Sequence, residues 1–240
     1  MKILVDTHTH TIASGHAFCT IHEMARAAKE KGLEAIAITE HGPTMPGGAH
    51  LYYFKNYNML SRCWDGIPVL FGVELNILDE KGTLDLPDHI IKRMDITIAS
   101  MHTRCYENKG KEINTQAYMK LMDRGDVDII GHPDDGRFPV DYEQLVAYAK
   151  KTGTLLEVNN HSLNPDSTRA GAHDNCLEML TYCREMRVPI VLGSDAHVDT
   201  QIADTTYSFL VLQEVNFPEE LVANRSYEEL KKYLRVKRHM

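Results

Sequence analysis

Short apolar runs recur along the chain, and longer amphipathic stretches separate them. The runs are apolar at almost every position, which is typical of parallel strands that are buried on both faces. They predict seven strands, at Ile3–Asp6, Ala35–Thr39, Val69–Val73, Asp95–Ser100, Val127–Gly131, Leu155–Asn159 and Pro189–Gly193. Strands that alternate with helices imply a parallel sheet with helical crossovers.

The amphipathic stretches predict the helices. Thr20 and Glu23 form a capping box at the start of the first helix, which runs to Lys31 and stops at Gly32. Further helices are expected at Leu51–Cys63, Thr115–Arg124, Tyr142–Lys151, His173–Arg187 and near Tyr227–Leu234. The polar, glycine-containing segment Leu78–Leu86 predicts a hairpin.

Every predicted strand ends in, or is followed by, a histidine or a carboxylate. These side chains are Asp6, His8, His10, Glu40, His41, Glu74, His102, His132, Glu157, His161, Asp195 and His197. In a closed barrel the carboxyl ends of all strands meet on one face, where such enzymes hold their active sites. An open sheet would spread the same side chains along a row. The convergence therefore predicts an α/β fold, a TIM-like (β/α)7 barrel that forms a single domain over residues 1–240.

The histidines at the strand ends point together to a metal site. His8 and His10 lie two residues apart and face the same way on an extended chain, but such a pair alone is a weak signal. Buried polar groups need partners, and metal ions best satisfy imidazoles and carboxylates that converge in one cleft. His16 lies in the loop directly after this pair and is a further candidate ligand. The remaining histidines are expected to be solvated or structural: His22, His50, His89, His173 and His239.

Composition and charge disfavour several other classes of protein. The chain has 26 Lys and Arg against 34 Asp and Glu, a formal net charge of −8, and we expect no stable nucleic-acid partner. The five cysteines contain no CxxC pair and suggest no disulfide framework, which favours the cytoplasm. No apolar run approaches the roughly 18 residues of a membrane span, and the N-terminal run is too short for a signal peptide. The basic segment Lys231–Arg238 is expected to be a solvated helix end.

The strand-end pattern resembles that of the PHP (polymerase and histidinol phosphatase) superfamily. The resemblance covers nearly the whole chain: an HxH pair near the N-terminus, a histidine in the next loop, single His, Glu, His and His residues in order, and a late DxH pair. The chain is most similar to the small stand-alone bacterial phosphatases that hold three metal ions. Membership would imply a distorted (β/α)7 barrel and a small phosphorylated substrate.

The resemblance also implies a set of metal ligands, and every position of the family pattern has a counterpart here. They are His8, His10, Glu74 and Asp195 for a first ion, Glu74, His102 and His132 for a second, and His16, His41 and His197 for a third. Glu74 is counted twice because it would bridge two ions. A ligand set rich in imidazole favours zinc, with manganese or iron as alternatives.

This interpretation predicts a phosphatase that needs no protein nucleophile. A hydroxide between two ions would attack phosphorus in line, because metal binding lowers the pKa of water to about 7. Glu74 and Asp195 would hold the catalytic ions, and the leaving-group proton would come from bound water, Asp195 or His161. Asp6 would either orient a ligand imidazole or cap its own turn.

Three other functions stay open at this point. A di-metal amidohydrolase or deaminase also combines HxH with a late aspartate in a barrel, but His16, His41 and His197 exceed its needs. A PHP-type nuclease or proofreading module is disfavoured by the acidic balance. A non-catalytic metal store or a degenerate interaction domain fits poorly with a complete ligand set.

The natural substrate, the native metal and the oligomeric state do not follow from the sequence. Specificity is expected to lie in the strand-end loops Gly42–Tyr53, Thr103–Asn114 and Asn160–Ala172. The candidates for substrate contact in or near these loops are Arg104, Asn159, His161 and Arg169.

Overall fold

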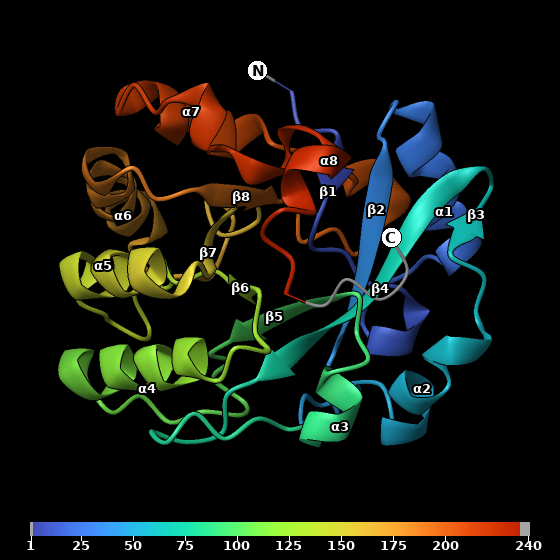
Figure 1. Ribbon diagram of the computed structural model, residues 1–240, viewed down its shortest axis with the longest axis horizontal. Helices are drawn as coiled ribbons and strands as arrows, with labels where there is room; N and C mark the ends of the chain where they lie inside the picture. The colour runs from blue at the N-terminus through green and yellow to red at the C-terminus, as the bar shows by residue number, and fades with distance from the viewer. Residues whose placement is uncertain (1, 236–240) are drawn as a thin grey trace.

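The computed structural model describes residues 2–235, and a curled sheet of parallel strands forms its centre (Figure 1). The strands pair in the order β1-β2-β4-β5-β6-β7-β8. Their bounds are β1 Val5–Asp6, β2 Ala35–His41, β4 Ile67–Asn76, β5 Ile96–Ser100, β6 Ile129–Ile130, β7 Leu155–Asn159 and β8 Ile190–Gly193. The short strand β3 (Cys63–Trp64) pairs antiparallel with the start of β4. The predicted parallel barrel is confirmed.

Helices cover the outside of the barrel, and α4, α5 and α6 lie side by side along one flank (Figure 1). The helices are α1 Ile21–Glu30, α2 Leu51–Lys55, α3 Asp88–Ile91, α4 Lys111–Asp123, α5 Tyr142–Thr152, α6 Ala172–Met186, α7 Thr206–Glu214 and α8 Tyr227–Leu230. The predicted capping box opens α1, because Thr20 N donates to Glu23 Oε2 at 2.7 Å while Glu23 N donates to Thr20 Oγ1 at 3.4 Å. No helix in the described part of the chain is long and apolar enough to span a membrane.

The barrel closes where the chain after β8 meets the chain after β1. There, His10 N donates to Ala196 O at 2.8 Å, and Asp195 N donates to His8 O at 3.0 Å. These bonds continue the sheet around the barrel, although β1 and β8 themselves do not form a ladder. The two ligand-rich segments of the sequence therefore become direct neighbours.

The opposite end of the same seam is filled by the buried side chain of Asn224. Its Nδ2 donates to Val5 O and to Leu192 O, both at 2.8 Å, and its Oδ1 accepts from Leu192 N at 3.1 Å. One side chain thus replaces the ladder bonds that β1 and β8 would otherwise make with each other. Buried backbone groups need such partners, so Asn224 is part of the barrel closure.

The inner face of the barrel changes from apolar to polar along each strand. An apolar cluster fills the inside: Val5, Ala35, Ala37, Leu70, Ile96, Ile98, Ile129, Leu155, Val191, Ala223, Leu230 and Leu234. Side chains alternate along a strand, so the face of β2 that carries Ala37 ends in His41. By the same rule, the face of β4 that carries Leu70 continues to Glu74 and Asn76. The apolar core thus gives way to metal-ligand types at the carboxyl ends.

The predicted helix at Leu51–Cys63 is wrong beyond Lys55. The chain instead continues through a 3₁₀ turn (Tyr57–Met59) into β3. The physical reason is the Asp65-Gly66 pair, whose φ angles of 50° and 84° make the positive-φ turn that folds β3 back on β4. This two-residue pair is a strong hairpin signal that the helical interpretation overlooked.

The other boundaries differ less. The hairpin predicted at Leu78–Leu86 is present, with Leu78 N donating to Thr83 O at 2.9 Å. The last helix, α8, ends at Leu230 rather than near Leu234, and the helices α3 and α7 were not expected. His239 and the end of the basic segment Lys231–Arg238 lie outside the described residues.

Candidate metal centre

The carboxyl ends of the strands bring nine predicted ligand side chains into one centre. They are His8 and His10 after β1, His16 in the next loop, His41 at the end of β2, Glu74 in β4, His102 after β5, His132 after β6, and Asp195 and His197 after β8. Glu74 lies in the middle of the group and is only 1% exposed. Both of its oxygens face imidazole nitrogens.

A first group of four ligand atoms surrounds one oxygen of Glu74. Glu74 Oε2 lies 3.5 Å from His8 Nε2 and 3.7 Å from His10 Nε2. Asp195 Oδ1 lies 3.6 Å and 3.2 Å from the same two nitrogens. Ligand atoms about 2.1 Å from a zinc ion lie roughly 3.4 Å apart at the corners of a tetrahedron. The four distances match that spacing.

A second group uses the other oxygen of the same carboxylate. Glu74 Oε1 lies 3.0 Å from His132 Nε2 and 3.2 Å from His102 Nε2. The two histidine rings are inclined to each other by 57°, with centroids 5.1 Å apart. Glu74 can therefore bridge two ions, one on each oxygen.

A third group lies nearer the surface. His16 Nε2 and His197 Nε2 are 3.1 Å apart, and the ring centroids of His16 and His41 are 5.0 Å apart. His41 also turns its Nδ1 to Glu74 Oε2, at 2.6 Å, so it links this group to the first. The three groups are contiguous.

The donor atoms of this centre fit divalent cations. Within the part of the chain that the structure describes, no hydrogen bond is made by His8 Nε2, His10 Nε2, His41 Nδ1, Glu74 Oε2 or His102 Nε2, although His41 Nδ1 and Glu74 Oε2 approach to 2.6 Å. A buried polar atom without a partner costs free energy, yet here five of them face one another. Nitrogen and oxygen lone pairs that converge in this way are what a zinc-type ion requires.

Burial and neighbouring charges shift the pKa values of Glu74, Asp195, His10 and His102 toward the forms that bind metal, whereas the carboxylates around His8, Glu157 first, raise the pKa of that imidazole. Burial alone would raise the pKa of Glu74, but the surrounding imidazoles, that of His102 first, hold it well below its usual value. Burial would likewise raise the pKa of Asp195, and His8 is the main group that holds it well below the usual range. Burial lowers the pKa of His102 to about 4 and depresses that of His10. Carboxylates and neutral imidazoles are the ligand forms that metals need.

Comparison with known proteins agrees with this geometry. A family model of the PHP domain matches residues 6–164. The chain belongs to the PHP domain family. Proteins named as probable phosphatases in Caldanaerobacter subterraneus subsp. tengcongensis and Acetivibrio thermocellus are 44% and 42% identical to it, over 99% of this chain and 93% and 98% of theirs. This PHP domain is thus an enzyme of the phosphatase type.

Solved structures share the fold. A histidinol phosphate phosphatase from Lactococcus lactis, complexed with zinc, L-histidinol and phosphate, has a TM-score of 0.64 and 19% identity over 91% of this chain and 95% of that one. A chain of an archaeal ribonuclease P bound to mature tRNA also has a TM-score of 0.64, with 18% identity over 95% and 89%. At such identities the likeness concerns the fold alone.

In this PHP domain a buried carboxylate behind the centre orients the first histidine. Glu157 Oε1 lies 2.7 Å from His8 Nδ1, and Glu157 Oε2 accepts from His132 N at 2.8 Å and from Asn159 Nδ2 at 3.2 Å. Because the carboxylate accepts, His8 carries its proton on Nδ1 and leaves Nε2 free for the centre. Gly193 makes room for this contact, since a Cβ there would lie 2.1 Å from Glu157 Oε1.

A second buried carboxylate orients His10 through a hydroxyl. Ser14 Oγ donates to Glu40 Oε2 at 2.6 Å and therefore accepts from His10 Nδ1 at 3.3 Å. Glu40 also accepts from Thr11 N at 3.1 Å and from the Tyr53 hydroxyl at 3.4 Å. Sequence reasoning noticed Glu40 and Glu157 only as strand-end carboxylates and assigned neither a role.

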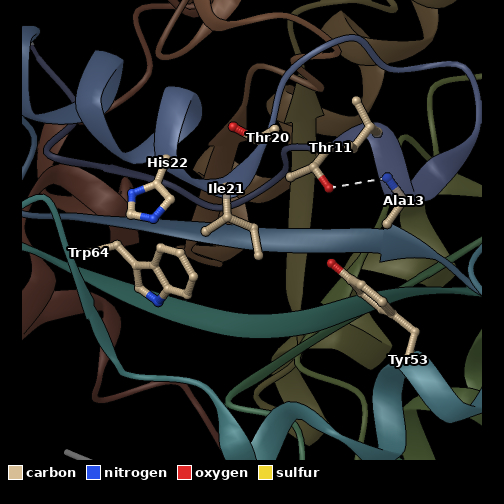
Figure 2. Close-up of a pocket in the computed structure, with 8 residues that line it drawn as sticks. Thr11, Ala13, Thr20, Ile21, His22, Tyr53 and Trp64 are labelled. Atoms are coloured by element: carbon tan, nitrogen blue, oxygen red, sulfur yellow. Dashed lines mark hydrogen bonds between the residues drawn. The ribbon is translucent and has the colours of Figure 1, made fainter.

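The Tyr53 hydroxyl also faces an apolar pocket of 480 Å³ (Figure 2). The pocket is lined by Thr11, Ile12, Ala13, Thr20, Ile21, His22, Tyr53 and Trp64. None of the nine ligand candidates lines it. Tyr53 and Thr11 belong both to this pocket and to the hydrogen bonds around Glu40.

The second oxygen of Asp195 is held from the loop after β7. Asp195 Oδ2 accepts from Arg169 at 3.0 Å and from Asn159 Nδ2 at 3.2 Å, and Arg169 also donates to Ser162 Oγ at 2.8 Å. Asp195 has a φ of 57° and His132 a φ of 30°, a region that non-glycine residues rarely occupy. Such backbone strain persists where surrounding contacts hold a functional side chain in place.

Several predicted residues lie outside the centre. His161 and Arg104 are exposed on strand-end loops. Asp6 caps its own turn by accepting from His8 N at 3.4 Å, and its carboxylate also accepts from Ser194 Oγ at 2.5 Å and from Ala203 N at 2.7 Å. The remaining described histidines have other places: His22 beside Asp65, His50 at the start of α2, His89 in α3, and His173 beside Glu214.

Proposed function

We propose that this PHP domain hydrolyses small phosphate monoesters at a centre of three divalent ions. The observation that carries the proposal is the set of buried, unpartnered donor atoms that face one another around Glu74. A phosphate dianion needs concentrated positive charge, and this ligand set would gather that charge at one point. The relatives named as probable phosphatases support the same reaction class.

The ligand assignment is the one that the family pattern implies, and the distances within the three groups support it. The first ion would be held by His8, His10, Glu74 and Asp195, the second by Glu74, His102 and His132, and the third by His16, His41 and His197. The seven imidazoles of this ligand set favour zinc over magnesium or calcium, with manganese or iron as alternatives. The fold relative from Lactococcus lactis, which carries zinc, is consistent with this choice.

The bound ions would neutralise the charge of the phosphate and lower the pKa of a water, so that hydroxide is available to attack phosphorus near neutral pH. The chain's own residues do the positioning. Glu157 and Ser14 hold the imidazoles of His8 and His10 so that Nε2 faces the centre. Arg169 holds one oxygen of Asp195 and leaves the other free for the centre.

The leaving group needs a proton, and His161 is the proposed donor. Asp195 is poorly suited to this task, because its Oδ2 accepts from Arg169 and Asn159 while its Oδ1 faces the imidazoles. His161 is exposed and lies two residues beyond the end of β7, on the face of the barrel that carries the centre. Because all five cysteines are free thiols, we place the enzyme in the cytoplasm.

The test is a substrate panel measured with and without added zinc or manganese. It contains alkyl and aryl phosphate monoesters, a phosphodiester, single-stranded DNA and a cyclic amide. We expect metal-dependent phosphate release from monoesters and little turnover of the others. Turnover of the amide alone would favour an amidohydrolase, and turnover of DNA alone would favour a nuclease; either would overturn the proposal.

A further inference from the structure

Asp85 lies outside the ligand groups, at the end of the hairpin that follows β4. Its Oδ1 accepts from Asn76 N at 3.0 Å. Its Oδ2 accepts from Asn76 Nδ2 at 2.6 Å and from Thr44 N at 3.0 Å. All three partners are N–H groups, which can only donate, so both oxygens must remain acceptors.

These contacts decide which way the Asn76 amide points. Asn76 Nδ2 faces two acceptors, Asp85 Oδ2 and Gly42 O, the latter at 3.2 Å. The amide oxygen must then point to the other side, where Asn76 Oδ1 lies 2.8 Å from His102 Nδ1. A flipped amide would place its oxygen against two acceptors and its NH₂ group against the imidazole.

The orientation of the amide in turn decides the tautomer of His102. Since Asn76 Oδ1 accepts, His102 carries its proton on Nδ1. Its Nε2 then keeps a free lone pair, directed at Glu74 Oε1 at 3.2 Å. An outer hydrogen bond that selects the ligating nitrogen is a general requirement for histidine in metal sites.

The fit around Asp85 is tight. A Cβ at Gly42 would lie 2.4 Å from both carboxylate oxygens, so the backbone approaches Asp85 at a distance that only glycine allows. Gly42 N also donates to Glu74 O at 2.8 Å, which ties the same loop to the bridging residue. The carboxylate therefore has little freedom to move away from Asn76.

We propose that Asp85 is a positioning residue for the ion held by Glu74, His102 and His132. It acts through Asn76, by keeping that amide in the one orientation that directs His102 Nε2 to the centre. The inference rests on the proposed metal centre and adds a residue to it that no ligand pattern marks. In Asp85→Asn the remaining oxygen takes the place of Oδ2, which has two donors, and the new NH₂ group then faces Asn76 N. Two N–H donors cannot pair, so Asn76 is displaced from the position in which its amide oxygen accepts from His102.

The test is competition between the zinc-loaded enzyme and a chromophoric chelator, with metal content per chain measured in parallel. For Asp85→Asn we expect one ion per chain to be bound about 10- to 100-fold more weakly, and the others to be retained. The matched control is Asp79→Asn in the same hairpin. Among residues 2–235 its carboxylate accepts only within its own turn, from Lys81 N and from Thr83 N and Oγ1. This control is expected to bind all ions as the wild type does.

A second measurement separates positioning from general stabilisation. In Asp85→Asn the melting temperature of the zinc-loaded enzyme should fall more than that of the metal-depleted enzyme, because weaker binding removes stabilisation of the folded state. A purely structural role would lower both equally. If Asp85→Asn does not fold, Gly42→Ala displaces the same carboxylate and is expected to weaken the same ion.

The outcomes distinguish the two proposals. A wild-type enzyme that holds no zinc against the chelator overturns the metal centre itself. The other outcome concerns Asp85 alone. If the wild type holds its ions and Asp85→Asn binds every ion as tightly as Asp79→Asn does, the metal centre stands and the role of Asp85 is overturned.

Discussion

Replacing Glu157 by glutamine turns one oxygen into an NH₂ group and removes one buried negative charge, with little change in the shape of the side chain. Glu157 accepts three hydrogen bonds, from His8 Nδ1, His132 N and Asn159 Nδ2. The last two donors face the same oxygen and cannot accept, so the glutamine oxygen must take that place. The new NH₂ group then faces His8 Nδ1, at the position of the 2.7 Å contact.

The substitution changes the protonation of His8 Nε2, the nitrogen that faces the centre. To accept from the NH₂ group, its ring must lose the proton from Nδ1 and carry it on Nε2, the atom that faces Glu74 and Asp195 at 3.5 and 3.6 Å. A protonated Nε2 cannot bind a metal. Outer hydrogen bonds of this kind contribute about 10- to 100-fold to metal affinity. That range corresponds to roughly 1.4–2.8 kcal/mol of binding free energy.

The assay is the dissociation constant of the weakest ion, measured by chelator competition, together with kcat at saturating metal. Glu143→Gln, on the exposed first turn of α5, is the matched control and should behave as the wild type. We expect Glu157→Gln to lose affinity and to recover part of its activity at high zinc concentration. An unchanged dissociation constant in a folded Glu157→Gln enzyme would refute the tautomer argument.

Three further predictions follow from other parts of the molecule. His161→Asn should lower kcat on alkyl phosphates by about 10²- to 10⁴-fold. The loss should be much smaller on p-nitrophenyl phosphate, because its leaving group needs no proton. Equal losses on the two substrates would exclude His161 as the acid. Asn224→Ala removes three buried hydrogen bonds to Val5 and Leu192 and should lower the free energy of unfolding, measured by urea denaturation, by about 3 kcal/mol. A decrease below about 1 kcal/mol would show that the closure of the barrel does not depend on Asn224. Chelator treatment should abolish activity and lower the melting temperature, and zinc or manganese should restore both; activity that survives complete metal removal would contradict the proposal.

The sequence predicts which side chains gather at one end of the barrel, because the carboxyl end of each strand can be recognised in the sequence. An apolar run followed at once by a histidine or carboxylate places that side chain on one face of any parallel barrel, whatever the exact strand bounds. Glu74 is found in this way although its neighbours in space, His8 and His132, are distant in the sequence. Strand-end position alone is sufficient information for such residues.

The residues that orient the ligand side chains cannot be identified from strand-end position. His8 and Glu157 are 149 positions apart, and their contact depends on the register between strands, which no local pattern encodes. No sequence motif marks Asp85 or Asn76, and their role depends on the orientation of the Asn76 side-chain amide. Asn224 closes the barrel from a segment without periodicity. The Asp65-Gly66 turn differs from these, since its signal was present and outweighed by an apparent helical pattern.

The central claim is that one chain binds three ions around Glu74. The most direct test is the number of metal ions per chain, measured by mass spectrometry on enzyme purified without chelator and then saturated with zinc or manganese. The account predicts a value near three, with phosphatase activity that rises as the sites fill. A value of two or fewer at saturation, with full activity, would contradict it.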